Sequence, residues 1–350
     1  MWEIPKIKQI EPIRSITFYD YLALIDCTLK ALTTSLMLTH SRAPDIMSKS
    51  ALVGRFHHKA LELAVTVNEK TELKKLIETE ISDLQKEVDK WPHLKRCGAV
   101  SGWDEVNQSA TNAIRIQRES RDGKAKVIVE RTYRTVDEVL IGRPDYFTII
   151  SDKAILKEYK STSLRTPSGI VKQEFLLQGQ FYAALIFDNF PVKKVEVWLE
   201  SFDGERLDFS VTHSVAEEFK AEVKSIIQKA NEIIRNFDVV EELSSPSSSS
   251  CQFCKNKIFC PAFPKVQLSL ELTGPVFILD AKLALVHENV NDQISKIQMV
   301  STYTADVYEI SIPTIYAEKM KLHERYLIEN LLYSSSRFLW TDQSRVHRNG

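Results

Sequence analysis

The chain has 350 residues, with 46 lysines and arginines against 47 aspartates and glutamates, for a formal net charge of −1. This balance excludes a protein that binds nucleic acid through bulk positive charge, so any such site must be a local groove. None of the 10 glycines builds a G-x-G-x-x-G or G-x-x-x-x-G-K-[ST] motif, which excludes a dinucleotide fingerprint and a P-loop.

The N-terminal residues 1–16 mix charged and apolar side chains without a continuous apolar core. We therefore expect no secretory signal and a cytoplasmic location. The most apolar helical stretch covers residues 21–38, but Asp26 and Lys30 within it predict a core helix rather than a membrane span. The 5 cysteines, in a reducing compartment, indicate metal ligation or redox chemistry rather than disulfides.

Apolar side chains recur every three or four positions through much of residues 18–91 and predict helices there, as they do at 104–118. Further along, the patterns predict strands at 127–129, 139–141, 154–160, 195–202 and 207–212, and helices at 173–187 and 214–237. This order predicts an α/β or α+β fold, with helices packed on a mixed sheet.

The C-terminal third changes character at a serine-rich run, residues 244–250, which predicts a flexible connector. Beyond Lys265, short β-like segments separated by polar turns predict a small β-rich accessory domain, with an OB-like barrel as a candidate topology. We therefore expect three parts: residues 1–243, 244–264 and 265–350.

One candidate catalytic group combines a Gly-Arg-Pro-Asp run ending at Asp145 with a Glu-x-Lys pair at Glu158 and Lys160. Glu158 and Lys160 share one face of a predicted strand, and Asp145 meets Glu158 if the two strands pair. Two carboxylates can ligate Mg²⁺ or Mn²⁺, and a lysine beside them can orient the attacking water. The group predicts phosphodiester hydrolysis, and the alternative is an exposed hairpin with an ordinary surface ion pair.

Three other residues can face the same site. Gln178 and Tyr182 lie four positions apart on one predicted helix face. His58 lies at the edge of an earlier helix's apolar face, where a neutral imidazole can ligate Mn²⁺. Taken singly, these residues are more often a packed tyrosine, a solvated glutamine and a structural histidine. Arg131, Arg134, Arg143 and Lys172 can supply local positive charge or lie solvated on the surface.

Three cysteines form a dense C-x-x-C-x₅-C group at Cys251, Cys254 and Cys260. Thiolates this close suit a soft metal or an iron–sulphur cluster, with a fourth ligand from elsewhere in the chain. A zinc site and a redox C-x-x-C pair are the alternatives.

In this order, the His, GxxD, ExK, QxxxY and CxxCx₅C motifs resemble the PD-(D/E)XK nuclease superfamily. More narrowly, they resemble its RecB-like branch with an iron–sulphur cluster, which includes CRISPR-associated adaptation exonucleases and AddB-type nuclease domains. The resemblance covers about residues 15–263. It implies a restriction-endonuclease-like fold and a divalent-metal-dependent DNA exonuclease that prefers single-stranded ends.

The resemblance also assigns roles to residues. It implies Mg²⁺ or Mn²⁺ ligands at His58, Asp145 and Glu158, a catalytic lysine at Lys160, and residues that shape the site and contact nucleic acid at Gln178 and Tyr182. It implies a [4Fe-4S] cluster on Cys27, Cys251, Cys254 and Cys260. Thr28 follows Cys27 where the family usually has proline, and Cys97 is the rival fourth ligand.

Compact members of the family lack the tail from residue 265 onward, which is compatible with a strand-binding surface or a protein-partner interface. Two other functions stay open: a non-catalytic scaffold that binds DNA ends, and a zinc-binding interaction module. DNA repair, CRISPR spacer acquisition and anti-phage defence are all compatible pathways.

Overall fold

The computed structural model describes residues 11–33, 49–90, 94, 97–121, 125–160, 162–201, 204–252, 254, 257, 260–272, 277–291, 294–303, 305–334, 337–341 and 344–348. It divides into two compact units. The first, called the sheet unit here, comprises Ile13–Leu22 and Arg42–Ile227. The second, called the terminal unit, comprises Met1–Pro12, Ala23–Ser41 and Gln228–Gly350.

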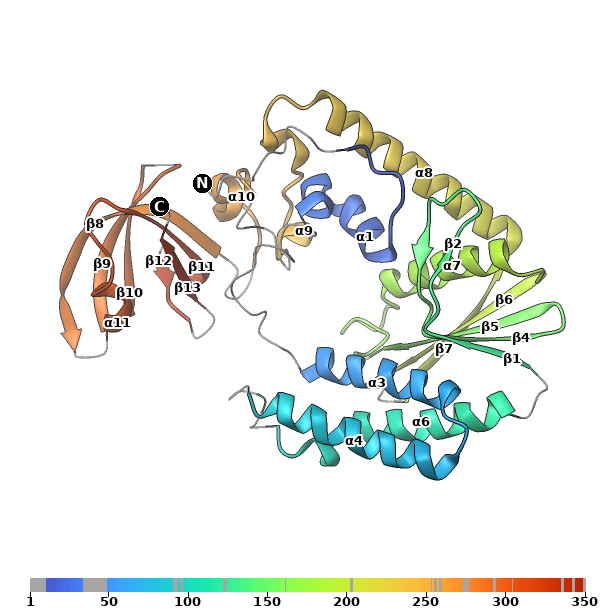
Figure 1. Cartoon of the computed structure of the whole chain (residues 1–350). Coiled ribbons are helices and arrows are strands. Elements are labelled where there is room, and N and C mark those ends of the chain that lie inside the picture. The colour runs from blue at the N-terminus through green and yellow to red at the C-terminus, as the bar shows by residue number, and fades with distance from the viewer. Residues whose placement is uncertain are drawn as a thin grey trace. The chain divides into compact units, whose positions relative to one another are not determined.

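A five-stranded mixed sheet forms the centre of the sheet unit (Figure 1). Its strands lie in the order β1 (Lys126–Val129), β4 (Tyr146–Ile150), β5 (Lys153–Lys160), β6 (Lys194–Ser201) and β7 (Arg206–Thr212). Only β5 and β6 run parallel, whereas the other neighbours are antiparallel. A parallel pair needs a crossover connection, which helix α7 (Gln173–Asn189) provides. The predicted mixed sheet with flanking helices is confirmed.

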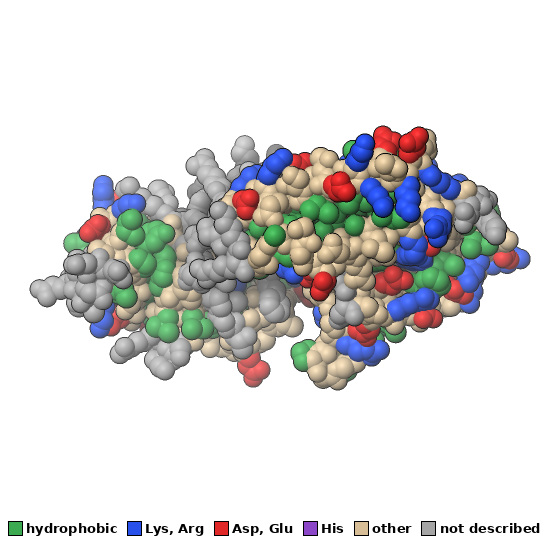
Figure 2. Space-filling view, turned by 90° about the horizontal axis from the view of Figure 1, so that it is seen from below, with side chains coloured by type: hydrophobic (Ala, Val, Ile, Leu, Met, Phe, Trp, Pro, Cys, Tyr) green, Lys and Arg blue, Asp and Glu red, His purple; other side chains and the backbone are tan. Residues whose placement is uncertain are grey.

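Helices lie on both faces of this sheet (Figure 1). One face is covered by α3 (Lys49–Thr66), α4 (Lys70–Val88) and α6 (Asp104–Arg121), with the short 3₁₀ helix η2 (Val100–Gly102) between the last two. These helices share a core that includes Leu52, Leu61, Leu73 and Ile116. Seen from the side of α4 and α6, basic and acidic side chains alternate over the surface, without a continuous basic face (Figure 2).

The opposite face carries α7, with α1 (Phe18–Asp26) and α8 (His213–Asn236) packed against it through aromatic rings. The ring of Phe181 lies 5.7 Å from Phe18 and 6.3 Å from Phe219. Tyr21 is fully buried, with its ring 5.3 Å from Phe219. The start of α1 is thereby held against the sheet unit.

Two of the predicted elements need correction. The strand predicted at 139–141 does not join the main sheet, because β2 (Tyr133–Arg134) and β3 (Ile141–Gly142) pair as a separate ribbon and Leu140 bridges to Ile16. The helix predicted at 21–38 is interrupted at Cys27, after which residues 28–33 are helical again. Residues 34–38 of that prediction lie outside the described residues.

The terminal unit contains the cysteine segment and a β-rich region, as predicted. Its helical elements are η3 (Val240–Leu243), α9 (Ser248–Gln252), α10 (Phe263–Val266), η5 (Gln267–Ser269) and α11 (Thr314–Ala317). Its strands are β8 (Phe277–Asn291), β9 (Ile294–Ser301), β10 (Val307–Pro313), β11 (Arg325–Ser334), β12 (Arg337–Leu339) and β13 (Arg345–Arg348). Their order is β12-β10-β9-β8-β11-β13, and β12 also pairs with β11, so five strands close into a ring.

The serine-rich run is ordered rather than an open connector. Ser250 is buried, and its hydroxyl lies 2.7 Å from that of Ser247. Serine hydroxyls here satisfy backbone groups at the start of α9, since the amide of Ser250 donates to the Ser247 oxygen at 3.1 Å. No helix in the described part of the chain is long and apolar enough to cross a membrane.

Candidate active site

The two adjacent histidines on α3 differ in exposure. His57 is buried, with its Nδ1 2.9 Å from the Ser109 hydroxyl and its ring 4.3 Å from that of Tyr159. Burial lowers the pKa of His57 to about 4, so it is neutral near pH 7. His58 has a side chain that is 42% exposed and faces a pocket beside the sheet.

The antiparallel pairing of β4 with β5 places Asp145 beside Glu158. Tyr146, the residue after Asp145, pairs with Lys157, the residue before Glu158. The amide of Asp145 donates to Glu158 Oε1 at 3.2 Å, and the amide of Tyr159 donates to Asp145 Oδ2 at 3.1 Å. Each carboxylate is thus oriented by the backbone of the other strand.

Glu130 joins this site from the end of β1, where the sequence patterns gave no indication of it. Its backbone φ of 48° lies in the left-handed region, and its amide donates to the Asp145 carbonyl at 3.2 Å. Its carboxylate accepts from Arg143 Nε at 2.6 Å and contacts Nδ1 of His58. Ligand atoms of His58, Glu130 and Asp145 all lie within 4.8 Å of one another, which suits a single divalent cation.

Glu158 is fully buried and lies outside that group of three. Burial, reinforced by the charge of Asp145, raises its pKa. For His58, burial alone would lower the pKa, but the carboxylates of Glu130, Asp145 and Glu158 raise it to about 9. Negative charge is therefore concentrated at this point, where a cation would be bound favourably.

Lys160 connects the carboxylates to helix α7. Its Nζ lies 3.4 Å from Glu158 Oε2 and donates to Gln178 Oε1. Gln178 in turn donates from Nε2 to the Tyr182 hydroxyl at 3.4 Å. Both Gln178 and Tyr182 are buried, so the structure brings the Glu-x-Lys and Gln-x-x-x-Tyr residues into one hydrogen-bonded chain.

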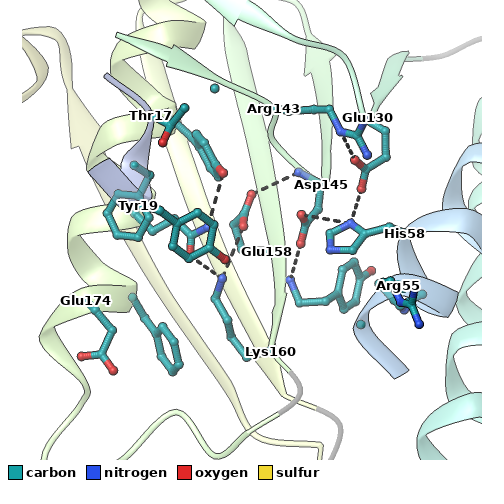
Figure 3. A pocket seen from close by; sticks show the side chains of 18 of the residues that line it. Thr17, Tyr19, Arg55, His58, Glu130, Arg143, Asp145, Glu158, Lys160 and Glu174 are labelled. Atoms are coloured by element: carbon teal, nitrogen blue, oxygen red, sulfur yellow. Dashed lines mark hydrogen bonds and ion pairs between the residues drawn. The ribbon is translucent and has the colours of Figure 1, made fainter. Parts of the chain in front are cut away.

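All these groups line one cavity of about 910 Å³ (Figure 3). Of the basic residues named from the sequence, Arg143 lines it, whereas Arg131, Arg134 and Lys172 are not among its lining residues. Arg55, two positions before His57, and Lys59, directly after His58, also line it and were missed. The sequence does carry a sign of them, because basic residues stand on both sides of the histidine pair in the helix that carries His58.

A second site lies in the terminal unit. Cys27, Cys251, Cys254 and Cys260 line one small cavity, whereas Cys97 is exposed and does not line it. Burial, with the neighbouring thiols of Cys27 and Cys251, raises the pKa of Cys260 to about 11. Four cysteines that line one cavity supply the donor atoms of either an iron–sulphur cluster or a zinc site.

Comparison with known proteins gives the family. The family model for the PD-(D/E)XK nuclease superfamily matches residues 16–261. The match covers most of the chain and includes both the sheet unit's site and the cysteine segment. The chain belongs to the PD-(D/E)XK nuclease superfamily, a family of phosphodiester hydrolases. No curated protein sequence matches it.

Three solved structures show distant likeness. A Eubacterium rectale protein named as a candidate exonuclease is 13% identical, over 63% of this chain and 82% of its own, with a TM-score of 0.37. SSO0001 is 14% identical, over 73% and 93%, with a TM-score of 0.29. An alkaline exonuclease from Laribacter hongkongensis is 11% identical, over 53% and 93%, with a TM-score of 0.26.

Proposed function

We propose that the protein is a divalent-metal-dependent DNA nuclease that removes nucleotides from single-stranded ends. One observation carries the proposal. Oxygen and nitrogen ligands from His58, Glu130 and Asp145 lie within 4.8 Å of one another, next to the ion pair that the buried Glu158 forms with Lys160. This donor set suits Mg²⁺ or Mn²⁺, both of which prefer carboxylate oxygens, and Mn²⁺ also accepts imidazole.

In the proposed site, His58, Asp145 and Glu158 hold the ion, as the family resemblance implies, and Glu130 contributes from β1. The bound ion would supply a more acidic water and neutralise charge that develops on the phosphate. Lys160, held between Glu158 and Gln178, positions the attacking water. Gln178 accepts a hydrogen bond from the lysine ammonium and donates one to the Tyr182 hydroxyl, and these two bonds hold the ammonium in the cavity.

The choice of substrate follows from the family and the local charge. Arg55, Lys59 and Arg143 line the cavity and can contact phosphates, which the neutral chain as a whole would not attract. DNA and single-stranded ends are favoured by the resemblance to iron–sulphur members of the family. A cytoplasmic location belongs to the same proposal.

We further propose a [4Fe-4S] cluster on Cys27, Cys251, Cys254 and Cys260, with a structural role. The convergence of these four thiols on one cavity supports it, and zinc is the competing occupant. Iron and acid-labile sulphide measured on anaerobically purified protein distinguish the two, since a zinc site contains neither. A redox pair would show two titratable thiols and no stoichiometric metal.

We also propose that residues 265–350 form an OB-type accessory domain. This is supported by the ring order β8-β9-β10-β12-β11, by the parallel pairing of β10 with β12, and by α11 between the third and fourth strands. A protein partner that binds through this domain stays a prediction from the sequence.

The nuclease is tested by Mn²⁺-dependent degradation of end-labelled single-stranded DNA, with Lys160→Ala beside the wild type. Lys153→Ala is the matched control, because Lys153 lies on the same strand and pairs with Glu196 at 2.7 Å, away from the site. We expect activity in the wild type and the control, and its loss in Lys160→Ala. Equal background in all three proteins, with the cluster present, would favour the non-catalytic DNA-end-binding scaffold.

A further inference from the structure

Tyr19 lies at the rim of the catalytic cavity with most of its surface in solvent. Its side chain belongs to the first turn of α1, lines the cavity and is 72% exposed. Figure 3 shows it on the same side of the cavity as Lys160, across from His58 and Arg55. A ring left in solvent contributes little to folding, and at the rim of the cavity its face is accessible to a ligand.

The backbone around Tyr19 is held rigidly. Thr17 and Asp20 form a reciprocal cap, in which the Thr17 amide donates to Asp20 Oδ2 at 2.9 Å and the Asp20 amide donates to Thr17 Oγ1 at 3.3 Å. Phe18, one position before, and Tyr21, two positions after, are buried against α7 and α8. Tyr19 is therefore presented to the cavity by an anchored turn and loses little entropy on contact with a ligand.

The ring of Phe175, which also lines the cavity and is partly exposed, is already covered by cations. Two ammonium groups lie over the ring of Phe175, that of Lys160 at 5.2 Å and that of Lys172 at 5.3 Å. Among the described residues, the ring of Tyr19 pairs only with Phe18, tilted by 58° at 6.0 Å, and no cation lies over it. A flat aromatic face is thus available beside the catalytic lysine.

We propose that Tyr19 is a stacking platform for an unpaired base of the DNA strand whose phosphate enters the metal site. This inference rests on the proposed nuclease function and explains how the site would select single-stranded DNA. A ring can stack on a base only where the base's own face is free, as at a single-stranded end, and stacking accepts any of the four bases. Arg55, Lys59 and Arg143 would hold the adjacent phosphates, so Tyr19 favours single strands over duplex without reading sequence.

Binding is tested first without turnover. A single-stranded oligonucleotide with 2-aminopurine as its terminal base, at the 5′ end in one set and the 3′ end in another, is titrated with full-length Lys160→Ala protein. Stacking quenches 2-aminopurine fluorescence. We expect quenching at one end, its loss in Tyr19→Ala, and its retention in Tyr19→Phe. Tyr316→Ala, which removes an exposed tyrosine of the terminal unit, is the matched control and should retain it.

Kinetics then separate stacking from a structural effect. Tyr19→Ala in otherwise wild-type protein should raise KM for single-stranded DNA by about 5- to 150-fold, the range expected for one base–aromatic contact, with little change in kcat. A substrate with an abasic terminal nucleotide should be equally poor for wild type and variant. The proposal would be overturned if Tyr19→Ala raised KM by the same factor on the normal and the abasic substrate. Unchanged 2-aminopurine quenching in Tyr19→Ala would also overturn it.

The two proposals fail differently. If the wild type shows no metal-dependent cleavage, the nuclease proposal fails, while quenching still reports whether Tyr19 stacks on a base. If the wild type cleaves and Tyr19→Ala matches it in both KM and quenching, only the stacking role fails.

Discussion

The Glu130 side chain is held in place by specific contacts, as are the site residues that the motifs predict. Its carboxylate is only 6% exposed and is shared between Arg143 and His58. A carboxylate that contacts one nitrogen of a histidine orients the ring and raises its basicity as a metal ligand. Glu130 either serves as a ligand itself or orients His58 toward the ion, and both roles require its negative charge.

We therefore expect Glu130→Gln to weaken Mn²⁺ binding by about 10- to 100-fold, the usual cost of losing such an outer carboxylate. Calorimetric titration of the purified protein with Mn²⁺ measures this directly. Glu174→Gln is the matched control, because Glu174 lines the same cavity but lies outside the group of three ligands. Similar Mn²⁺ affinity in Glu130→Gln and the control would exclude both roles.

Individual site residues differ in how far the sequence could reveal them. Asp145, Glu158 and Lys160 stand in short motifs, and the strand pairing that brings them together follows from their spacing. Glu130 stands alone after a β-branched run, and its role depends on the pairing of β1 with β4 and on its left-handed φ. Neither is encoded in a local pattern, so only the folded structure identifies it.

Helix α7 can deliver Gln178 and Tyr182 because glycine allows it to approach the sheet closely. A Cβ added at Gly179 would lie 2.6 Å from Phe209 Cζ and 2.8 Å from Val197 Cγ1. By contrast, a Cβ at Gly54, within α3, would meet nothing within 4 Å. The same residue type thus has a packing role in one helix and none in the other.

We expect Gly179→Ala to destabilise the protein by about 1–3 kcal/mol through overpacking. Gly54→Ala should instead stabilise it by up to about 1 kcal/mol, because alanine favours a helix interior over glycine. Chemical denaturation of both variants against wild type measures the difference. If Gly179→Ala is as stable as the wild type or more stable, α7 has room to shift away from the sheet.

The ribbon formed by β2 and β3 is tied to α8 through Asp137. Burial alone would raise its pKa, but hydrogen bonds from Lys224, Thr135 and the amide of Val139 lower it to about 2. An unfolded aspartate titrates near pH 4, so this group adds stability above that pH, and the contribution is lost as the pH falls toward 2.

Asp137→Asn should therefore lower the free energy of unfolding by about 1 kcal/mol at pH 7, a value reduced from the full pKa shift because the pair is partly solvated. The difference from wild type should shrink at pH 3. Denaturation at both pH values tests this, with Asp208→Asn as control, since Asp208 is 66% exposed and only 3.9 Å from Arg206. A difference that does not depend on pH would mean that the hydrogen bonds matter but the charge does not.

At the scale of elements, periodicity predicts the long helices and the strands of the main sheet. It fails where tertiary contacts override local preference. The apolar pattern runs through Cys27 without a break, yet the helix stops there, and the Sγ of Cys27 accepts from the Ser245 amide at 3.4 Å. Likewise, serine composition predicts flexibility at 244–250, but reciprocal hydroxyl bonds order the run.

Within the terminal unit, the cysteine segment and the β-rich region share a core. Cys251 and Phe263 belong to one apolar cluster with Ile278 of β8 and Leu327 of β11. The side-chain amide of Gln267 donates to the Ile278 carbonyl at 2.6 Å and accepts from its amide at 2.9 Å, as a neighbouring strand would. The group held by the cysteines would therefore order more than its own loop.

In this arrangement the proposed [4Fe-4S] cluster would be a structural joint, whose loss should spread into the β-rich region. A metal site that forms only in the folded state contributes its binding free energy to stability. Losing about 2 kcal/mol of it would lower the unfolding temperature by about 4–8 °C.

Cys254→Ser should accordingly lose its metal and show faster amide hydrogen exchange in residues 28–33 and in the first half of β8, with β4 and β5 unchanged. Cys97→Ser is the matched control, because Cys97 is exposed and outside the four-thiol cavity. Gln267→Ala removes the hydrogen bonds to Ile278 but none of the four cysteines. It should therefore speed amide exchange in β8 while the metal content stays the same. Metal loss in Cys254→Ser without any change in exchange or unfolding temperature would mean that the four cysteines bind their group without supporting the fold.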